Sequence, residues 1–70
     1  MAKAFIRPGT VYEIIKQSTN ARISEDAVKY LADYLTEMCI EIGQKAAELA
    51  SHSKRKTIKK EDIVFVIKNV

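Results

Sequence analysis

The sequence predicts an all-α protein in which a short helix, a long central helix and a second short helix follow one another and two chains share one core. Three observations predict this class. Apolar residues recur at helical spacing in three segments. The central apolar stripe is longer than one small domain covers. The 70-residue chain has one cysteine and one histidine, so no internal disulfide or Cys/His metal cage supports its small core, and a partner chain remains.

The first helix is predicted to begin near Thr10. Thr10 and Glu13 have the spacing of a capping box, in which an N-cap hydroxyl and a carboxylate three residues later accept each other's unpaired N–H groups. Apolar residues follow at helical spacing: Val11, Ile14 and Ile15. The polar run 17–20 is predicted to end the helix, with Asn20 in the left-handed conformation that commonly terminates helices.

The second helix is predicted to follow Ser24, a favourable N-cap, and to run from Glu25 to Ser51. Glu25 and Asp26 place negative charge at the positive end of the helix dipole. An apolar stripe follows at three- and four-residue steps: Ala27, Leu31, Leu35, Met38, Ile42, Ala46 and Leu49. Cys39 lies beside this stripe and is expected to be buried. Such a helix is roughly 40 Å long, whereas a globule of this chain length is about 30 Å across, so another chain is needed to cover the stripe.

The third helix is predicted to begin between Lys59 and Glu61, with Glu61 and Asp62 in its first turn. Its apolar face is formed by Ile63, Val66 and Ile67. The preceding segment, residues 55–58, is partly β-prone and is expected to be extended.

Charge is distributed unevenly along the chain. The formal net charge is +3 and the pI is about 9.1. Residues 1–23 and 53–70 are basic, whereas residues 24–52 are acidic. If the two basic ends meet on one face, that face attracts a polyanion such as nucleic acid.

Several other functions find little support in the sequence. No apolar run approaches the roughly 20 residues that a membrane span needs, and residues 1–6 lack the apolar stretch of a secretory signal. A cytoplasmic protein without a membrane partner is therefore expected. With one histidine, one cysteine and no glycine-rich phosphate loop, the chain is not expected to be an enzyme or to bind a metal, a cofactor or a small-molecule substrate.

Three segments resemble archaeal histones. Residues 55–63 (RKTIKKEDI) resemble the signature around the second loop and third helix. Residues 22–27 (RISEDA) resemble the first loop and the start of the long helix, and residues 14–16 (IIK) resemble the end of the first helix. The resemblance covers about residues 10–68. It implies a histone fold that forms an intertwined handshake dimer, with residues 1–70 as one domain and a short extension over about residues 1–8. It also implies sequence-nonspecific binding of double-stranded DNA and compaction of DNA by wrapping, on the chromosome (nucleoid).

The resemblance implies a DNA-binding role for particular residues. In a handshake dimer the first loop of one chain lies beside the second loop of the other, so Arg22 meets residues 55–57 of the other chain. Arg22 is implied to enter the minor groove. Thr57 is implied to orient that arginine across the dimer, and Lys56 and Lys16 to contact phosphates. Arg55 belongs to the same DNA-binding set. A lone loop arginine or a charge run is otherwise a solvated surface feature.

The resemblance further implies how dimers associate. Leu49 is implied to pack in a four-helix bundle between dimers, where His52 pairs with Asp62 of the neighbouring dimer. Arg55 and Asp62 of one chain are implied to form a salt bridge that braces the second loop. The expected partners are therefore a second copy of the chain, further dimers along DNA and, as an alternative, paralogues in heterodimers. For His52, the other interpretation is an exposed histidine that suits a helix C-terminus.

Two alternative functions stay open at this point. One is a histone-fold interaction module that pairs with a different chain. The other is a DNA-bridging tetramer that links duplexes without wrapping them. The first would be poorly behaved alone and would have lost part of its loop basic residues, most of which are present here.

Glu13 departs from the archaeal-histone pattern, in which many members have an arginine that reaches DNA. A carboxylate repels phosphate, so DNA contact at the first helix is expected to be weaker here. We expect Glu13→Arg to tighten DNA binding, with the largest gain at low salt, because phosphate contacts weaken as salt rises. Titration of a labelled duplex at several salt concentrations measures this effect. Equal affinities at low salt would contradict it.

Overall fold

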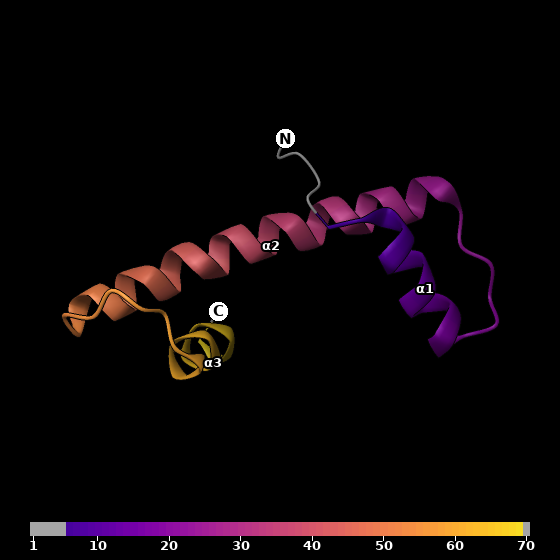
Figure 1. Ribbon diagram of the computed structural model, residues 1–70. Coiled ribbons are helices and arrows are strands. Elements are labelled where there is room, and N and C mark those ends of the chain that lie inside the picture. Colours follow the sequence, from indigo (N-terminus) through magenta and orange to yellow (C-terminus); the bar gives the residue numbers. More distant parts are fainter. Residues whose placement is uncertain (1–5, 70) are drawn as a thin grey trace. The chain divides into compact units, whose positions relative to one another are not determined.

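The computed structural model of the chain describes residues 6–69, which form three helices joined by two loops (Figure 1). The helices are α1 (Pro8–Ser18), α2 (Glu25–His52) and α3 (Lys60–Lys68). No strand occurs within residues 6–69, so the predicted all-α class and the short-long-short order are confirmed. The chain divides into two compact units, Met1–Glu37 and Met38–Val70, and α2 contributes to both. None of the described helices is long and apolar enough to cross a membrane.

α1 begins two residues earlier than predicted, at Pro8. Proline suits the first helical turn because its φ is already helical and it lacks the N–H that would be left unpaired there. Arg7 is the N-cap, and its carbonyl accepts hydrogen bonds from the N–H groups of Thr10 (3.1 Å) and Val11 (3.3 Å). The predicted capping box is therefore wrong. Thr10 lies inside the helix, and Glu13 is an exposed side chain without a capping role.

α1 ends at Ser18, inside the polar run that was predicted to stop it. The hydroxyl of Ser18 donates to the Ile15 carbonyl (2.9 Å), and the N–H of Thr19 donates to the same carbonyl (3.0 Å). Thr19 has an extended backbone with φ −156°. The left-handed conformation predicted for Asn20 is wrong, because Lys54 alone among the described non-glycine residues has a positive φ.

The first unit has a small core between α1 and the N-terminal half of α2. Val11, Val28 and Ala32 are its buried members. Partly buried apolar side chains pack against them: Ile6, Ile15, Ile23 and Leu31. The Ile6 N–H donates to the Thr36 hydroxyl (3.3 Å), which donates to the Ala32 carbonyl (2.9 Å), so the segment before α1 is fastened to α2.

α2 begins as predicted, because the Ser24 hydroxyl accepts a hydrogen bond from the Ala27 N–H (3.2 Å). Small or medium-sized residues account for all of its buried positions: Val28, Ala32, Thr36, Ala46 and Ala50. None of its large apolar residues is buried: Leu31, Met38, Ile42 and Leu49 are partly buried, and Leu35 is 38% exposed. Cys39 is exposed, so its predicted burial is wrong for the single chain. One chain thus covers the apolar stripe of α2 only in part, which is typical of an interaction face.

Gly43 lies in the interior of α2, where glycine weakens a helix by about 0.5–1 kcal/mol relative to alanine. Apart from its two chain neighbours and the backbone of the surrounding helical turns, no atom of residues 6–69 lies within 4 Å of the position that a Cβ would occupy. We therefore expect Gly43→Ala to stabilise the protein by about this amount. Thermal unfolding followed by circular dichroism measures the change. A lower unfolding midpoint would contradict the prediction and would indicate that another chain lies against Gly43.

Candidate nucleic-acid interface

A tight turn after α2 starts the second loop. The Arg55 N–H donates to the Ala50 carbonyl (2.9 Å) and the Lys54 N–H to the Ser51 carbonyl (2.9 Å), which is the bond pattern of a Schellman motif. Lys54 has φ 59°, in the left-handed region. Glycine is the usual residue there, and a side chain costs roughly 1 kcal/mol. The turn therefore fixes the direction in which the chain leaves the helix.

The second loop, residues 53–59, is closed by an ion pair between Arg55 and α3. The Arg55 guanidinium donates from Nη2 to Asp62 Oδ1 (2.9 Å) and from Nη1 to Asp62 Oδ2 (3.0 Å). The same Nη1 donates to the Thr57 carbonyl (3.0 Å). The Lys59 N–H donates to Asp62 Oδ2 (2.8 Å). The Asp62 carboxylate thus binds both Arg55 and the last residue of the loop, Lys59, and Arg55 binds Thr57 between them.

Asp62 also caps α3. It occupies the third position of the helix and accepts the N–H of the N-cap residue Lys59. Lysine offers no side-chain acceptor, so this is one half of a capping box. The hydrogen bond from Arg55 and then that from Lys59 lower the pKa of Asp62 to about 2, although burial opposes the shift. The same hydrogen bond to Asp62 raises the pKa of Arg55. Both groups are therefore charged near neutral pH.

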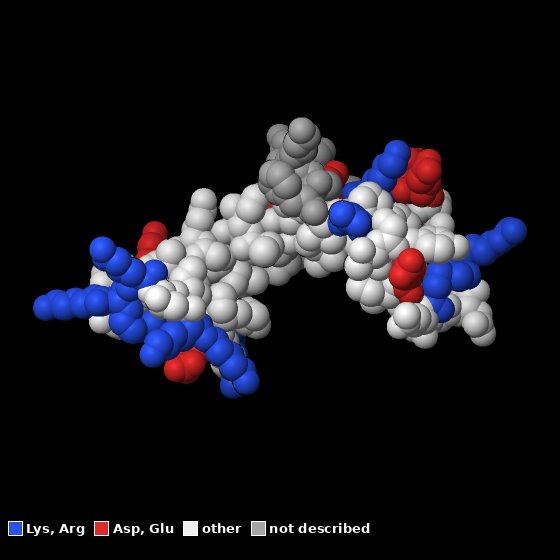
Figure 2. All heavy atoms as spheres, viewed as in Figure 1, with Lys and Arg blue, Asp and Glu red and all other residues white. Residues whose placement is uncertain are grey.

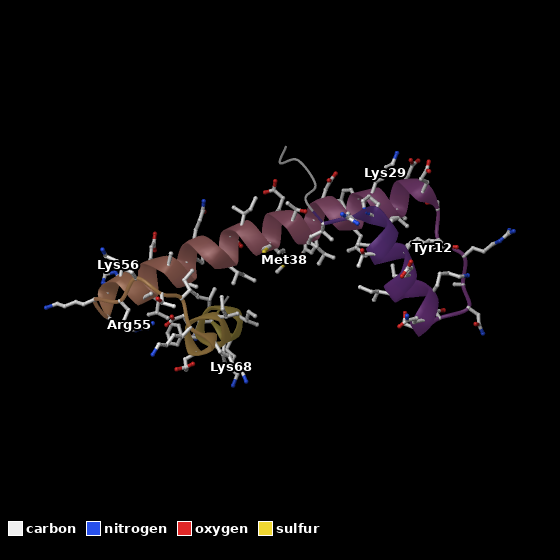
Figure 3. The ribbon with its side chains drawn as sticks, viewed as in Figure 1. Tyr12, Lys29, Met38, Arg55, Lys56 and Lys68 are labelled. Atoms are coloured by element: carbon white, nitrogen blue, oxygen red, sulfur yellow. The ribbon has the colours of Figure 1, made fainter. Side chains whose placement is uncertain are left out.

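Basic side chains gather over the end of α2, the second loop and α3 (Figure 2). The loop and the start of α3 supply five of them: Lys54, Arg55, Lys56, Lys59 and Lys60. Lys56 and Thr57 are exposed, and their main-chain N–H groups donate to no acceptor within residues 6–69. Figure 3 shows Arg55 and Lys56 on this loop. The loop therefore offers cationic side chains and unpaired N–H donors on a braced backbone, which is chemistry that suits phosphate.

The other predicted DNA-binding residues belong to the first unit. Lys16 is exposed in the last turn of α1, and Arg22 is exposed in the loop between α1 and α2. In that loop the Ala21 N–H donates to the Thr19 hydroxyl (3.2 Å). The single chain brings together Arg55, Thr57 and Asp62, whereas the predicted meeting of Arg22 with the second loop needs two chains.

A groove in the second unit contains two of the predicted interface residues. Its lining comes from the C-terminal part of α2 and from α3: Lys45, Glu48, Leu49, His52, Phe65, Val66 and Asn69. Leu49 is partly buried and His52 is exposed. Phe65 is 55% exposed beside them and was not predicted as an interface residue. In the sequence it only broadened the apolar face of α3, and its exposure became evident only in the folded unit. Within residues 6–69, no group of three or more His, Cys, Asp or Glu side chains is arranged to hold a metal ion.

A sequence model of the family described as "Histone-like transcription factor (CBF/NF-Y) and archaeal histone" matches residues 4–67. The chain belongs to this family. The three helices, in short-long-short order, are those of its histone fold. The histone fold predicted from the sequence is therefore confirmed.

Three relatives of this histone-fold chain agree with that result. An archaeal histone HAN1 subunit of Thermococcus zilligii is 46% identical over 68 residues, which are 97% of this chain and 98% of the relative. Probable archaeal histone 3 of Methanocaldococcus jannaschii is 48% identical over 50 residues, 71% of this chain and 75% of the relative. DNA-binding protein HmvA of Methanococcus voltae is 43% identical over 58 residues, 83% of this chain and 59% of the relative. The resemblance to archaeal histones is confirmed.

The Asp62 ion pair predicts an acid-sensitive step in stability. The pKa of Asp62 is about 2 in the folded chain, against an ordinary value of 3.8. Because the folded pKa is the lower one, the stabilisation is complete above about pH 4 and is lost as the pH falls from about 4 to about 2. We expect Asp62→Asn to flatten this part of the profile of unfolding free energy against pH, measured by urea denaturation.

The matched control is Glu61→Gln, which removes the neighbouring, exposed carboxylate. It is expected to keep the step between pH 4 and 2. If the Asp62→Asn profile kept the same step as the unmodified protein, the assignment of the step to Asp62 would be wrong.

Proposed function

We propose that two copies of this chain form a handshake dimer that wraps double-stranded DNA without reading its sequence. As a histone-fold protein of the archaeal histone family, the chain binds and compacts DNA and dimerises through its fold. The observation that carries the proposal is the braced second loop, where exposed Lys56 and Thr57 carry unpaired N–H groups on a basic surface. Such a surface recognises the phosphate backbone, which every DNA sequence shares.

The uncovered face of α2 supports a second copy as the partner. Along its apolar stripe, Leu35 is 38% exposed in the single chain, and Met38, Ile42 and Leu49 are only partly buried. A helix of 28 residues with such a face buries it most simply against an identical helix. The Thermococcus relative is named as one subunit of a histone, so a paralogue is the alternative partner. In either dimer the first loop of one chain would lie beside the second loop of the other.

We assign the DNA contacts as follows. Arg22 enters the minor groove at the point where the groove faces the protein. Thr57 of the other chain orients the Arg22 side chain. Lys56 and Lys16 contact phosphates. The Arg55 guanidinium donates three hydrogen bonds within the chain, two to Asp62 and one to the Thr57 carbonyl, so the main role of Arg55 is to position the loop. Its side chain is 31% exposed, which leaves its remaining donors near the DNA.

Binding of this kind depends on counterion release and on DNA flexibility. Each neutralised phosphate makes the slope of log affinity against log salt concentration more negative by about 0.9. Sequence preference then follows the ease with which DNA bends. The protein would therefore be found on the chromosome, in the cytoplasm.

We also propose that dimers associate along DNA through the groove that contains Leu49 and His52. Phe65 adds apolar area beside Leu49. Asp62 is 2% exposed, and both of its oxygens already accept hydrogen bonds within the chain. His52 of a neighbouring dimer would therefore reach only a remaining acceptor position of this carboxylate, so the apolar contacts supply most of the association.

Nuclease digestion of long DNA loaded with the purified protein tests the proposed function. Protected fragments that lengthen in regular steps are expected, because each added dimer extends the wrapped DNA. Tight binding without defined protection would favour a bridging tetramer. This is the second candidate function, because the Glu13 carboxylate weakens DNA contact at the first helix. No binding at moderate salt would favour a protein–protein interaction module.

His52→Ala tests the association of dimers in the same assay. We expect shorter protected fragments than with the unmodified protein, while the smallest fragment is retained. The control is Gln44→Ala, an exposed position on α2 outside the groove. If His52→Ala left the series of protected fragments unchanged, His52 would have no part in the association of dimers. A single fixed fragment length with the unmodified protein would indicate a closed particle.

A further inference from the structure

Lys54 occupies a backbone conformation that its side chain disfavours. It is the one described non-glycine residue with a positive φ, 59°, at the position after a helix where glycine is usual. Main-chain hydrogen bonds form the turn without the Lys54 side chain: the Lys54 N–H donates to the Ser51 carbonyl, and the Arg55 N–H donates to the Ala50 carbonyl. A glycine would form the same turn with less strain. The structure of the chain therefore gives no reason for a side chain at this position.

The lysine charge also has no partner within the described chain. Lys54 is exposed, and its ammonium makes no hydrogen bond or ion pair with residues 6–69. A lysine near a helix C-terminus commonly caps the last carbonyls. Here the carbonyls of Leu49, Ala50 and Ser51 already accept main-chain N–H groups of residues 53–55. Capping of α2 is thus mostly complete without the side chain.

The position of Lys54 is rigid and adjoins the proposed DNA surface. Its own N–H and that of Arg55 are bonded to α2, and the Arg55 side chain is bonded to Asp62. The lysine therefore projects from an anchored point within the second loop, two residues before Lys56. Strain that persists at such a point commonly serves a function. An anchored cation also loses less entropy when it meets a fixed anion than a cation on a mobile segment does.

We propose that Lys54 is a further phosphate contact of the DNA surface. The lysine serves this contact although its backbone strain lowers the stability of the turn that ends α2. The inference rests on the proposed function. Its ligand is one backbone phosphate of duplex DNA for each Lys54, and so two phosphates for each dimer. The residue contributes to affinity and to salt dependence equally for all sequences, because a phosphate carries no sequence information.

The test compares Lys54→Gly, Lys54→Gln and Lys54→Arg with the unmodified protein in two measurements. Thermal unfolding reports on strain, and titration of a labelled duplex between 50 and 200 mM salt reports on phosphate contacts. Lys54→Gly is expected to raise the unfolding midpoint by several degrees. It is also expected to make the slope of log affinity against log salt concentration less steep by about 2 for each dimer. Its affinity deficit is then about tenfold larger at 50 mM than at 200 mM salt. Lys54→Gln is expected to lose the same contacts without the gain in midpoint, and Lys54→Arg to bind as the unmodified protein does.

Lys29→Gln is the matched control, because it removes one exposed positive charge of α2 outside the second loop and outside the groove between dimers. It is expected to leave the salt dependence of binding unchanged. If Lys54→Gly and Lys54→Gln bound with the salt dependence of the unmodified protein, or if Lys29→Gln weakened that dependence as much as they do, the inference would be overturned. Absence of DNA binding by the unmodified protein would instead overturn the proposed function.

Discussion

The buried carboxylate of Asp62 connects the end of α2, the second loop and the start of α3. It accepts hydrogen bonds from the Arg55 guanidinium and from the Lys59 N–H. A buried charge that loses its partner is strongly destabilising, so the loop adopts the shape that keeps Arg55 in place. The position of Thr57 follows, because the same guanidinium binds its carbonyl. The surface offered to DNA is in this sense a consequence of one ion pair.

The second constraint is the mismatch between the length of α2 and the size of the chain. Each compact unit buries only small or medium-sized residues of this helix, such as Ala32 in the first and Ala46 in the second. Larger apolar residues are left for a partner. Folding, dimerisation and DNA binding are therefore linked in the proposed function, because the dimer that covers α2 also brings Arg22 of one chain to the second loop of the other.

Charge and stability compete in the second loop. The five basic residues of the loop and the start of α3 repel one another, and just one of them, Arg55, forms an ion pair within the described chain. Lys54 adds backbone strain to that repulsion. A surface that binds a polyanion is expected to concentrate positive charge in this way, since the repulsion is relieved when phosphates bind. The marginal core of a 70-residue chain makes the bracing by Asp62 more important.

The sequence alone determined the three helices, the start of α2 directly after Ser24 and the pairing of Arg55 with Asp62, because apolar spacing, a capping hydroxyl and a family motif are local signals. It failed where two local signals compete. Thr10 and Glu13 have capping-box spacing, but Pro8 starts the helix earlier because its φ is already helical. The left-handed residue is Lys54, although Asn20 has the better intrinsic preference, because the anchoring of Arg55 to Ala50 and Asp62 imposes that conformation. Exposure of Cys39 and Phe65 was likewise decided by tertiary packing, since periodicity shows which side chains are apolar but not which chain covers them.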